Sequence, residues 1–187
     1  MSPPFLPHPE SASLLVIDVQ ERLLPAMPPV EQVAIMKHVI NLVQLFAEMG
    51  GPCLYTEQYP RGLGPTVPEL RAALEGFGGA AERLEKLAFS ACQEAAFLDR
   101  ELRRDVVLVG MEAHVCVLMT GLDLLARGHR VFVPLDGVAS RAPANRDNGL
   151  ALLGRAGAVV VNTESLIFHA LGRAGSDAFK RFSARVK

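Results

Sequence analysis

Three residues of this chain have types and positions that together could perform nucleophilic catalysis. Asp18 directly follows a run of aliphatic residues, Lys86 ends a second candidate strand, and Cys116 stands where a loop gives way to an amphipathic stretch. In one cleft they would supply a proton acceptor, a cation and a nucleophilic thiol. That combination suits attack on a carbonyl carbon, provided that the fold brings the three side chains together.

Cys116 is the candidate nucleophile, because its position predicts an activated thiol. A thiol at a helix N-terminus lies at the positive end of the helix dipole and beside unpaired backbone N–H groups, which lower its pKa. The same N–H groups could stabilise the oxyanion that forms when a carbonyl is attacked. Position alone also leaves open a buried structural cysteine, which is how we interpret Cys53 and Cys92.

The other two residues also have ordinary interpretations. A carboxylate at a strand end, such as Asp18, could cap a helix, and a lone lysine such as Lys86 is usually a solvated surface residue. The fold decides between these interpretations and the catalytic one.

The elements that must position these residues alternate between short apolar runs and longer stretches with helical spacing. Continuous apolar runs are typical of parallel strands buried on both faces. Strands alternating with helices predict an α/β fold, a three-layer α/β/α sandwich with a six-stranded parallel sheet. The predicted strands are 14–17, 53–56, 83–86, 106–109, 131–133 and 158–161, and the predicted helical stretches are 33–49, 92–103, 117–127 and 146–156. Residues 59–68, which are rich in proline and glycine, are expected to form an ordered loop.

In an open parallel sheet, ligands bind beyond the carboxyl ends of the strands. The three residues singled out above all lie at or shortly after strand ends, so this topology favours their convergence. Candidate contacts to a small-molecule substrate on the same strand-end loops are Gln20, Tyr59, Phe89 and His114. Two alternatives stay open, because Phe89 could belong to the core and His114 could point away from the cleft.

Composition limits the partners that this chain could have. It has 187 residues, of which 50% are hydrophobic and 21% are charged, the balance of one globular domain. A net charge of −1 without blocks of like charge argues against nucleic-acid binding, and no apolar run reaches the ~18 residues of a membrane helix. Residues 1–10 are expected to be a loose N-terminal arm that is no signal peptide, and residues 11–187 a single domain. The three cysteines lack disulfide or zinc spacing, which favours a cytoplasmic location.

Three segments of the chain together resemble a known family. They are LLVIDVQ at 14–20, KLAFSA at 86–91 and GMEAHVCV at 110–117. In this order they resemble the isochorismatase-like cysteine hydrolases, a superfamily that includes nicotinamidases, N-carbamoylsarcosine amidohydrolases and isochorismatases. The resemblance covers residues 13–165, and segment 56–70 further resembles the branch called isochorismatase domain-containing proteins.

The resemblance implies both a fold and a mechanism. It implies a six-stranded parallel sheet with helices on both faces and a catalytic triad of Asp18, Lys86 and Cys116. Asp18 would take the thiol proton and later activate water, Lys86 would favour the thiolate, and Cys116 would form a covalent acyl intermediate. It also implies a cis peptide bond between Met111 and Glu112, with the backbone N–H groups of Glu112 and Cys116 as the oxyanion hole.

Two departures from relatives in that superfamily narrow the expected reaction. Nicotinamidases bind a metal through Asp-x-His after the second strand, whereas this chain has Glu57, Gln58 and Tyr59 there and no histidines at ligand spacing. We therefore expect no metal and no other cofactor. Isochorismatases act on a vinyl ether and carry no cysteine at the nucleophile position. Cys116 therefore favours hydrolysis of a small amide at its C–N bond, with ester hydrolysis as the less favoured alternative.

Other functions and the assembly state stay open at this point. Cys116 could be oxidised rather than acylated in a thiol-reactive or redox-sensing protein. The chain could also be a non-catalytic binding module that keeps the hydrolase fold. A nucleotide-binding Rossmann protein is disfavoured, because no glycine-rich turn follows the first strand. Apolar residues on more than one face of 112–127 could serve internal packing or a subunit interface. The family resemblance implies a homo-oligomer, because members of that family commonly oligomerise.

Overall fold

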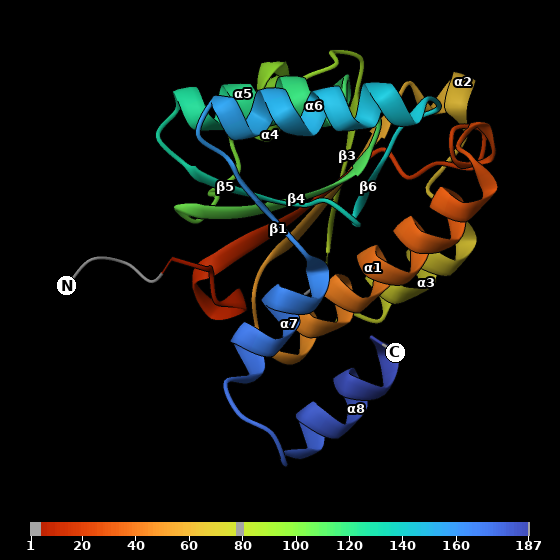
Figure 1. The fold of residues 1–187 in the computed structure, drawn as a ribbon. Helices are drawn as coiled ribbons and strands as arrows, with labels where there is room; N and C mark the ends of the chain where they lie inside the picture. Colours follow the sequence, from red (N-terminus) through yellow and green to blue (C-terminus); the bar gives the residue numbers. More distant parts are fainter. Residues whose placement is uncertain (1–4, 78–80, 187) are drawn as a thin grey trace.

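The computed structural model describes residues 5–77 and 81–186, which form three layers with a parallel sheet in the middle (Figure 1). The sheet has the strand order β3-β2-β1-β4-β5-β7, and the short strand β6 pairs with the end of β4. Its strands are β1 (Ala12–Ile17), β2 (Cys53–Gln58), β3 (Glu82–Lys86), β4 (Asp105–Met111), β5 (Arg130–Pro134), β6 (Val138–Ala139) and β7 (Val159–Val161). The predicted fold class and all six predicted strands are confirmed, and β6 is the addition.

Helices cover both faces of this sheet. The helices α4 (Ala95–Leu98), α5 (Cys116–Ala126) and α6 (Pro143–Arg155) lie on one face (Figure 1). The helices α1 (Pro29–Glu48), α3 (Pro68–Glu75), α7 (Thr163–Leu171) and α8 (Asp177–Arg185) lie on the other face. The chain crosses between β1 and β2 through α1, and between β4 and β5 through α5.

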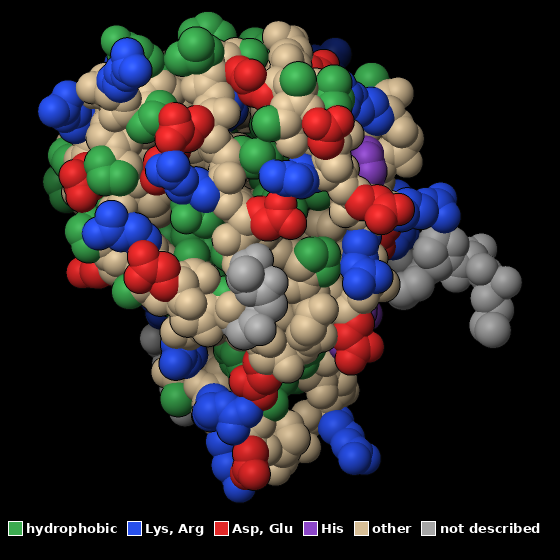
Figure 2. Space-filling model, turned by 180° about the vertical axis from the view of Figure 1, so that it is seen from behind, with side chains coloured by type: hydrophobic (Ala, Val, Ile, Leu, Met, Phe, Trp, Pro, Cys, Tyr) green, Lys and Arg blue, Asp and Glu red, His purple; other side chains and the backbone are tan. Residues whose placement is uncertain are grey.

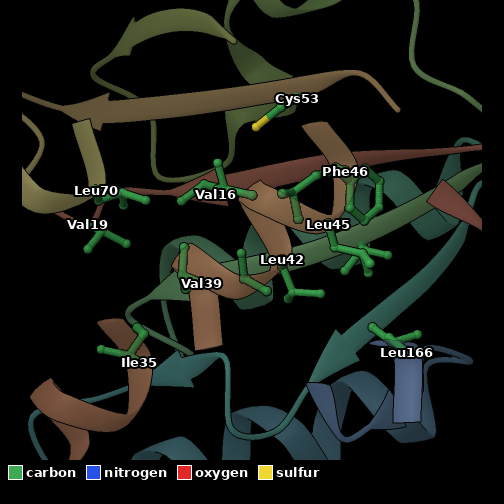
Figure 3. Close-up of a cluster of buried hydrophobic side chains, with 14 of the residues drawn as sticks. Val16, Val19, Ile35, Val39, Leu42, Leu45, Phe46, Cys53, Leu70 and Leu166 are labelled. Atoms are coloured by element: carbon green, nitrogen blue, oxygen red, sulfur yellow. The ribbon is translucent and has the colours of Figure 1, made fainter. Parts of the chain in front are cut away.

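The position of β1 in the middle of the sheet explains why its sequence is continuously apolar. Leu14 and Val16 belong to the hydrophobic cluster under α1, whereas Leu15 and Ile17 belong to the cluster under α5. Successive side chains of a strand point to opposite faces, so a strand covered on both sides must be apolar at every position. Figure 3 shows Val16 packed in the first cluster with side chains of α1.

Two of the predicted elements differ from the structure. The predicted helical stretch 92–103 contains only a 3₁₀ turn at Ala91–Gln93 and the single turn α4, because the charged sequence that follows leaves few apolar side chains to bury. The expected loop 59–68 contains a short helix, α2 (Pro60–Leu63). Pro60 occupies its first position, where the fixed φ of proline favours helix initiation.

The expected loose arm is wrong for the residues just before β1. Residues 1–4 lie outside the described residues, but Pro7 and Pro9 are buried. Residues Pro9–Ser11 form a 3₁₀ turn, and the ring nitrogen Nε2 of His8 lies 3.2 Å from the carbonyl oxygen of Ala170. The proline rings are apolar, so they gain free energy by packing against the domain.

The surface matches the small net charge of the chain. On the face shown in Figure 2, basic and acidic side chains are interspersed. No helix within 5–77 or 81–186 is both long enough and apolar enough to cross a membrane.

Candidate functional site

Asp18 lies where the central strand β1 ends. Its backbone has a φ of +52°, a left-handed conformation that is uncommon for residues other than glycine and concentrates at functional sites. The carboxylate is completely buried, and the hydroxyl of Thr56 donates a hydrogen bond of 2.6 Å to its Oδ1 atom. The neighbouring strand β2 therefore fixes one carboxylate oxygen and leaves Oδ2 to face the rest of the site.

Lys86 is buried at the end of β3, which excludes the solvated interpretation of this residue. Its ammonium nitrogen lies 2.7 Å from Oδ2 of Asp18. This contact is an ion pair without hydrogen-bond alignment, since Oδ2 has no hydrogen-bond partner within the described residues. The ammonium instead donates to Oε1 of Gln58 at 2.6 Å and to the carbonyl oxygens of Ala88 and Phe89 at 3.3 and 3.2 Å.

Cys116 is the first residue of α5, and its side chain is almost fully buried. Asp18 and Lys86 both lie close enough to its thiol to shift the thiol pKa in opposite directions. The three residues that the sequence singles out thus come together from β1, β3 and α5. Because Oδ1 of Asp18 is occupied by Thr56, Oδ2 is the oxygen available to accept the thiol proton.

The predicted lowering of the Cys116 pKa is wrong. The pKa of this thiol is raised to about 12, chiefly by burial and then by the negative charge of Asp18, while the positive charge of Lys86 opposes the rise. Loss of water around the thiolate outweighs the attraction that the sequence position indicated. At neutral pH the thiol is therefore protonated, and attack requires a base.

Close backbone approach builds the loop that carries Cys116. Gly110 has a φ of +117°, and a Cβ atom there would lie 2.0 Å from the carbonyl oxygen of Ile17. Only glycine therefore allows β4 to lie this close to β1 beside Asp18. The peptide bond between Met111 and Glu112 is cis. As the first helical residue, Cys116 has a backbone N–H without an acceptor inside its own helix.

Gln20, an expected substrate contact, has a different role in the structure. It is fully buried, and its Nε2 atom donates to the carbonyl oxygens of Gln58 and Gly64 at 3.0 and 2.6 Å. Its Oε1 atom accepts from the backbone N–H of Gln58 at 2.8 Å. Both amide hydrogens are used, so Gln20 connects the ends of β1 and β2 to the loop around α2.

The other three expected contacts have accessible side chains, and that of His114 is half-buried. Tyr59 and Phe89 are 53% and 60% exposed, so Phe89 is not a core residue. The carbonyl oxygen of Phe89 accepts from Lys86, which places this residue next to the ion pair. The ring of His114 lies 3.0 Å from the hydroxyl of Ser140 and 3.4 Å from Nδ2 of Asn145, on the side of the loop away from β3.

A pocket of about 310 Å³ opens beside the end of β3. Its lining residues are Tyr59, Pro60, Arg61, Glu85, Lys86, Leu87 and Glu94. Neither Asp18 nor Cys116 contributes to that lining, so the pocket adjoins the triad without containing the thiol. It has room for a small organic molecule or part of one.

Sequence reasoning missed Thr56 and Gln58, which contact the triad from β2. Both are polar and almost fully buried at the end of a strand, and the two polar side chains reach Asp18 and Lys86 respectively. A polar residue in a buried strand needs a partner, and this signal could have identified them.

Glu57 lies where nicotinamidases carry their Asp-x-His metal ligands, but its carboxylate makes other contacts. Its carboxylate accepts from the backbone and hydroxyl of Thr66 at 2.7 and 2.8 Å and pairs with Arg83 at 2.9 Å. Within 5–77 and 81–186 there is no group of three or more histidine, cysteine or acidic residues that could hold a metal ion.

Comparison with known proteins agrees with this architecture. The family model described as the isochorismatase domain matches residues 12–165. Isochorismatase domain-containing protein 2 of Macaca fascicularis is 39% identical, over 96% of this chain and 84% of that protein. A Caenorhabditis elegans structure described as MAR1 ribonuclease is 32% identical with a TM-score of 0.84, over 97% of this chain and 92% of that one.

A more distant structure supports the fold alone. The YcaC gene product of Escherichia coli, described as an octameric hydrolase of unknown specificity, is 19% identical with a TM-score of 0.87. The match covers 99% of this chain and 92% of that one. With the isochorismatase domain model spanning most of its length and a curated relative matching nearly all of it, this chain belongs to the isochorismatase domain family.

Proposed function

We propose that this protein is a cysteine hydrolase that cleaves the C–N bond of a small amide without a cofactor. The observation that carries the proposal is the convergence of a buried Asp18–Lys86 ion pair, 2.7 Å apart, on the thiol of Cys116. A buried ion pair is expensive to build and weak evidence of stability, so its place against a nucleophile favours a chemical role.

In the first step the Oδ2 atom of Asp18 accepts the thiol proton while the sulfur of Cys116 bonds to the amide carbon. Asp18 becomes neutral as the sulfur shares its electron pair with the carbon, and the negative charge passes to the carbonyl oxygen of the substrate. The backbone N–H groups of Glu112 and Cys116 would stabilise the oxyanion. The C–N bond then breaks and the amine leaves with the proton from Asp18.

In the second step water hydrolyses the acyl intermediate. Asp18, again a carboxylate, accepts a proton from water while the hydroxide oxygen bonds to the acyl carbon. The C–S bond breaks, the sulfur recovers the proton, and a carboxylic acid leaves. Tyr59, Phe89 and His114 are the proposed walls of the substrate site, and Gln20 is not among them because its amide hydrogens are used internally.

We further propose that the protein assembles as a homo-oligomer. In α5 most apolar side chains are buried, but Met119 and Leu122 are 43% and 37% exposed, and Leu87 and Phe89 in the loop after β3 are exposed as well. The hydrogen bond from Ser90 to Asp123 brings these two segments together. The octameric description of the distant E. coli relative points in the same direction, and the cytoplasmic location stays a prediction.

Ribonuclease activity is the second candidate, because the C. elegans neighbour is described by that name. The net charge of −1 and the interspersed charges in Figure 2 do not favour an RNA-binding surface. A redox-sensing role would need only the cysteine, so it leaves the buried ion pair unexplained. A binding module without catalytic activity would hydrolyse no amide, and substitution of Cys116 would then have no effect on catalysis.

The test measures ammonia release from a panel of simple aliphatic and aromatic primary amides, with single-stranded RNA cleavage measured in parallel. The wild-type chain is compared with Cys116→Ser and with Cys53→Ala, a cysteine substitution on the opposite face of the sheet. We expect hydrolysis of at least one amide, its loss in Cys116→Ser, and its retention in Cys53→Ala. Hydrolysis that persists in Cys116→Ser, or RNA cleavage without amide hydrolysis, would refute the proposal.

A further inference from the structure

Gln58 makes a contact that the proposed mechanism does not use. Its Oε1 atom accepts the hydrogen bond from Lys86 at 2.6 Å, and its Nε2 atom donates to the carbonyl oxygen of Leu87 at 2.8 Å. Gln58 and Lys86 are also register partners across β2 and β3. The amide thus connects the ammonium to the loop that follows it.

The backbone of Gln58 is fixed as firmly as its side chain. Gln20 accepts from its N–H and donates to its carbonyl oxygen, at 2.8 and 3.0 Å. Glu94 accepts from the backbone N–H groups of Leu87 and Ala88 at 2.7 and 2.8 Å, which holds the loop opposite. Gln58 therefore approaches Lys86 from a rigid position.

We propose that Gln58 is a positioning residue, whose neutral oxygen holds the Lys86 ammonium so that Asp18 is the one carboxylate that touches it. This inference rests on the proposed function. Proton transfer from Cys116 to Asp18 requires the ammonium to face the new thiolate while keeping its other contacts. Neutral acceptors allow this, because they hold the nitrogen without adding negative charge next to the sulfur.

A carboxylate in place of the amide would change that balance. Asp18 and Gln58 contact the same nitrogen, so Gln58→Glu would put a second negative charge beside the thiol. A like charge at this range disfavours ionisation by about 1 pKa unit or more. The charged groups around the thiol would then be Asp18, Lys86 and the new carboxylate, with Glu94 near Lys86.

The experiment measures iodoacetamide alkylation of each cysteine between pH 7 and 9, read by peptide mass spectrometry on the full chain. In this range the rate at Cys116 rises with the thiolate fraction, so a one-unit shift is a tenfold change at fixed pH. We expect Gln58→Glu to slow Cys116 at least tenfold. Gln93→Glu, which adds the same charge at an exposed position in the 3₁₀ turn, should change it less than twofold.

A second test moves the single carboxylate at Lys86 from residue 18 to residue 58. Asp18→Asn removes the carboxylate and should speed Cys116 alkylation, because Lys86 then faces the thiol unopposed. Adding Gln58→Glu to Asp18→Asn restores one carboxylate at Lys86 and should reverse that gain. Buried Cys53 reports folding in every variant, since it reacts only when the core opens.

Two results separate the inference from the proposed function. If the double variant alkylates Cys116 as fast as Asp18→Asn, or folded Gln58→Glu matches the wild-type chain, Gln58 does not position Lys86 and the inference is wrong. If the wild-type chain hydrolyses no amide of the panel, the proposed function itself fails, whatever the alkylation rates are.

Discussion

The buried ion pair between Lys86 and Asp18 makes a strong prediction about stability. Lys86→Met keeps the volume of the side chain but leaves the carboxylate of Asp18 buried without its counter-charge. Removing one partner of a buried pair typically costs 3–5 kcal/mol, so we expect a loss of about 4 kcal/mol in the free energy of unfolding. The double variant Asp18→Asn/Lys86→Met should recover a large part of this loss, because it removes both charges.

Urea unfolding followed by far-ultraviolet circular dichroism measures the effect. With a slope of about 2 kcal/mol per molar urea, the midpoint of Lys86→Met should fall by roughly 2 M. The matched control is Lys180→Met, since Lys180 pairs with Asp177 on the exposed surface of α8. An exposed pair contributes about 0–1 kcal/mol. Equal small losses in both variants would show that Asp18 and Lys86 are not a buried ion pair, and the proposed charge balance would be wrong.

Three further predictions concern protons and metals. Asp18→Asn should abolish amide hydrolysis while speeding iodoacetamide alkylation of Cys116, because the base is lost but Lys86 still favours the thiolate; slower alkylation would contradict this account. The pKa values of the buried thiols are raised in the folded protein, so the unfolded chain loses its thiol protons first as the pH rises above about 9. The free energy of unfolding should therefore fall between about pH 9 and the folded pKa of about 12 for Cys116. The slope is up to about 1.4 kcal/mol per pH unit for each thiol. Urea midpoints at pH 8, 9 and 10 measure this slope, and Cys53→Ala should reduce it. Hydrolysis should survive incubation with EDTA, and loss of activity restored by added metal would overturn the expectation of a metal-free site.

Much of the fold could be predicted because its signals are local. A strand buried on both faces must be apolar at every position, so β1, β4 and β5 are recognisable from their residues alone. The helical stretch 92–103 failed because helix length depends on what a segment can bury, and only Phe97 of α4 has a place in the core. Burial of Pro7 and Pro9 depends on surfaces supplied by distant segments, which no local pattern contains.

For the candidate site, the sequence predicted which residues come together but not how their side chains are oriented. Parallel topology brings strand ends together, so Asp18, Lys86 and Cys116 could be grouped from their positions after or at strand ends. Orientation was not predictable, as Gln20 shows: it follows β1 as expected but is used entirely by the backbone of β2 and the α2 loop. The sign of the Cys116 pKa shift also depends on burial, which the sequence position at a helix start does not reveal.

That sign determines how such a site would work. A cysteine that is a stable thiolate at neutral pH would be exposed to oxidation before substrate arrives. Here burial keeps the thiol of Cys116 protonated, and the ion pair beside it stores both the base and the cation. Transfer of the proton from Cys116 to Asp18 moves negative charge from the carboxylate to the sulfur and leaves the net charge of the group unchanged. A buried site can accommodate such a step, because no new charge must be desolvated, whereas it would resist releasing the proton to water. The arrangement therefore favours a nucleophile that forms during attack on a carbonyl carbon over a permanently ionised, redox-sensitive thiol.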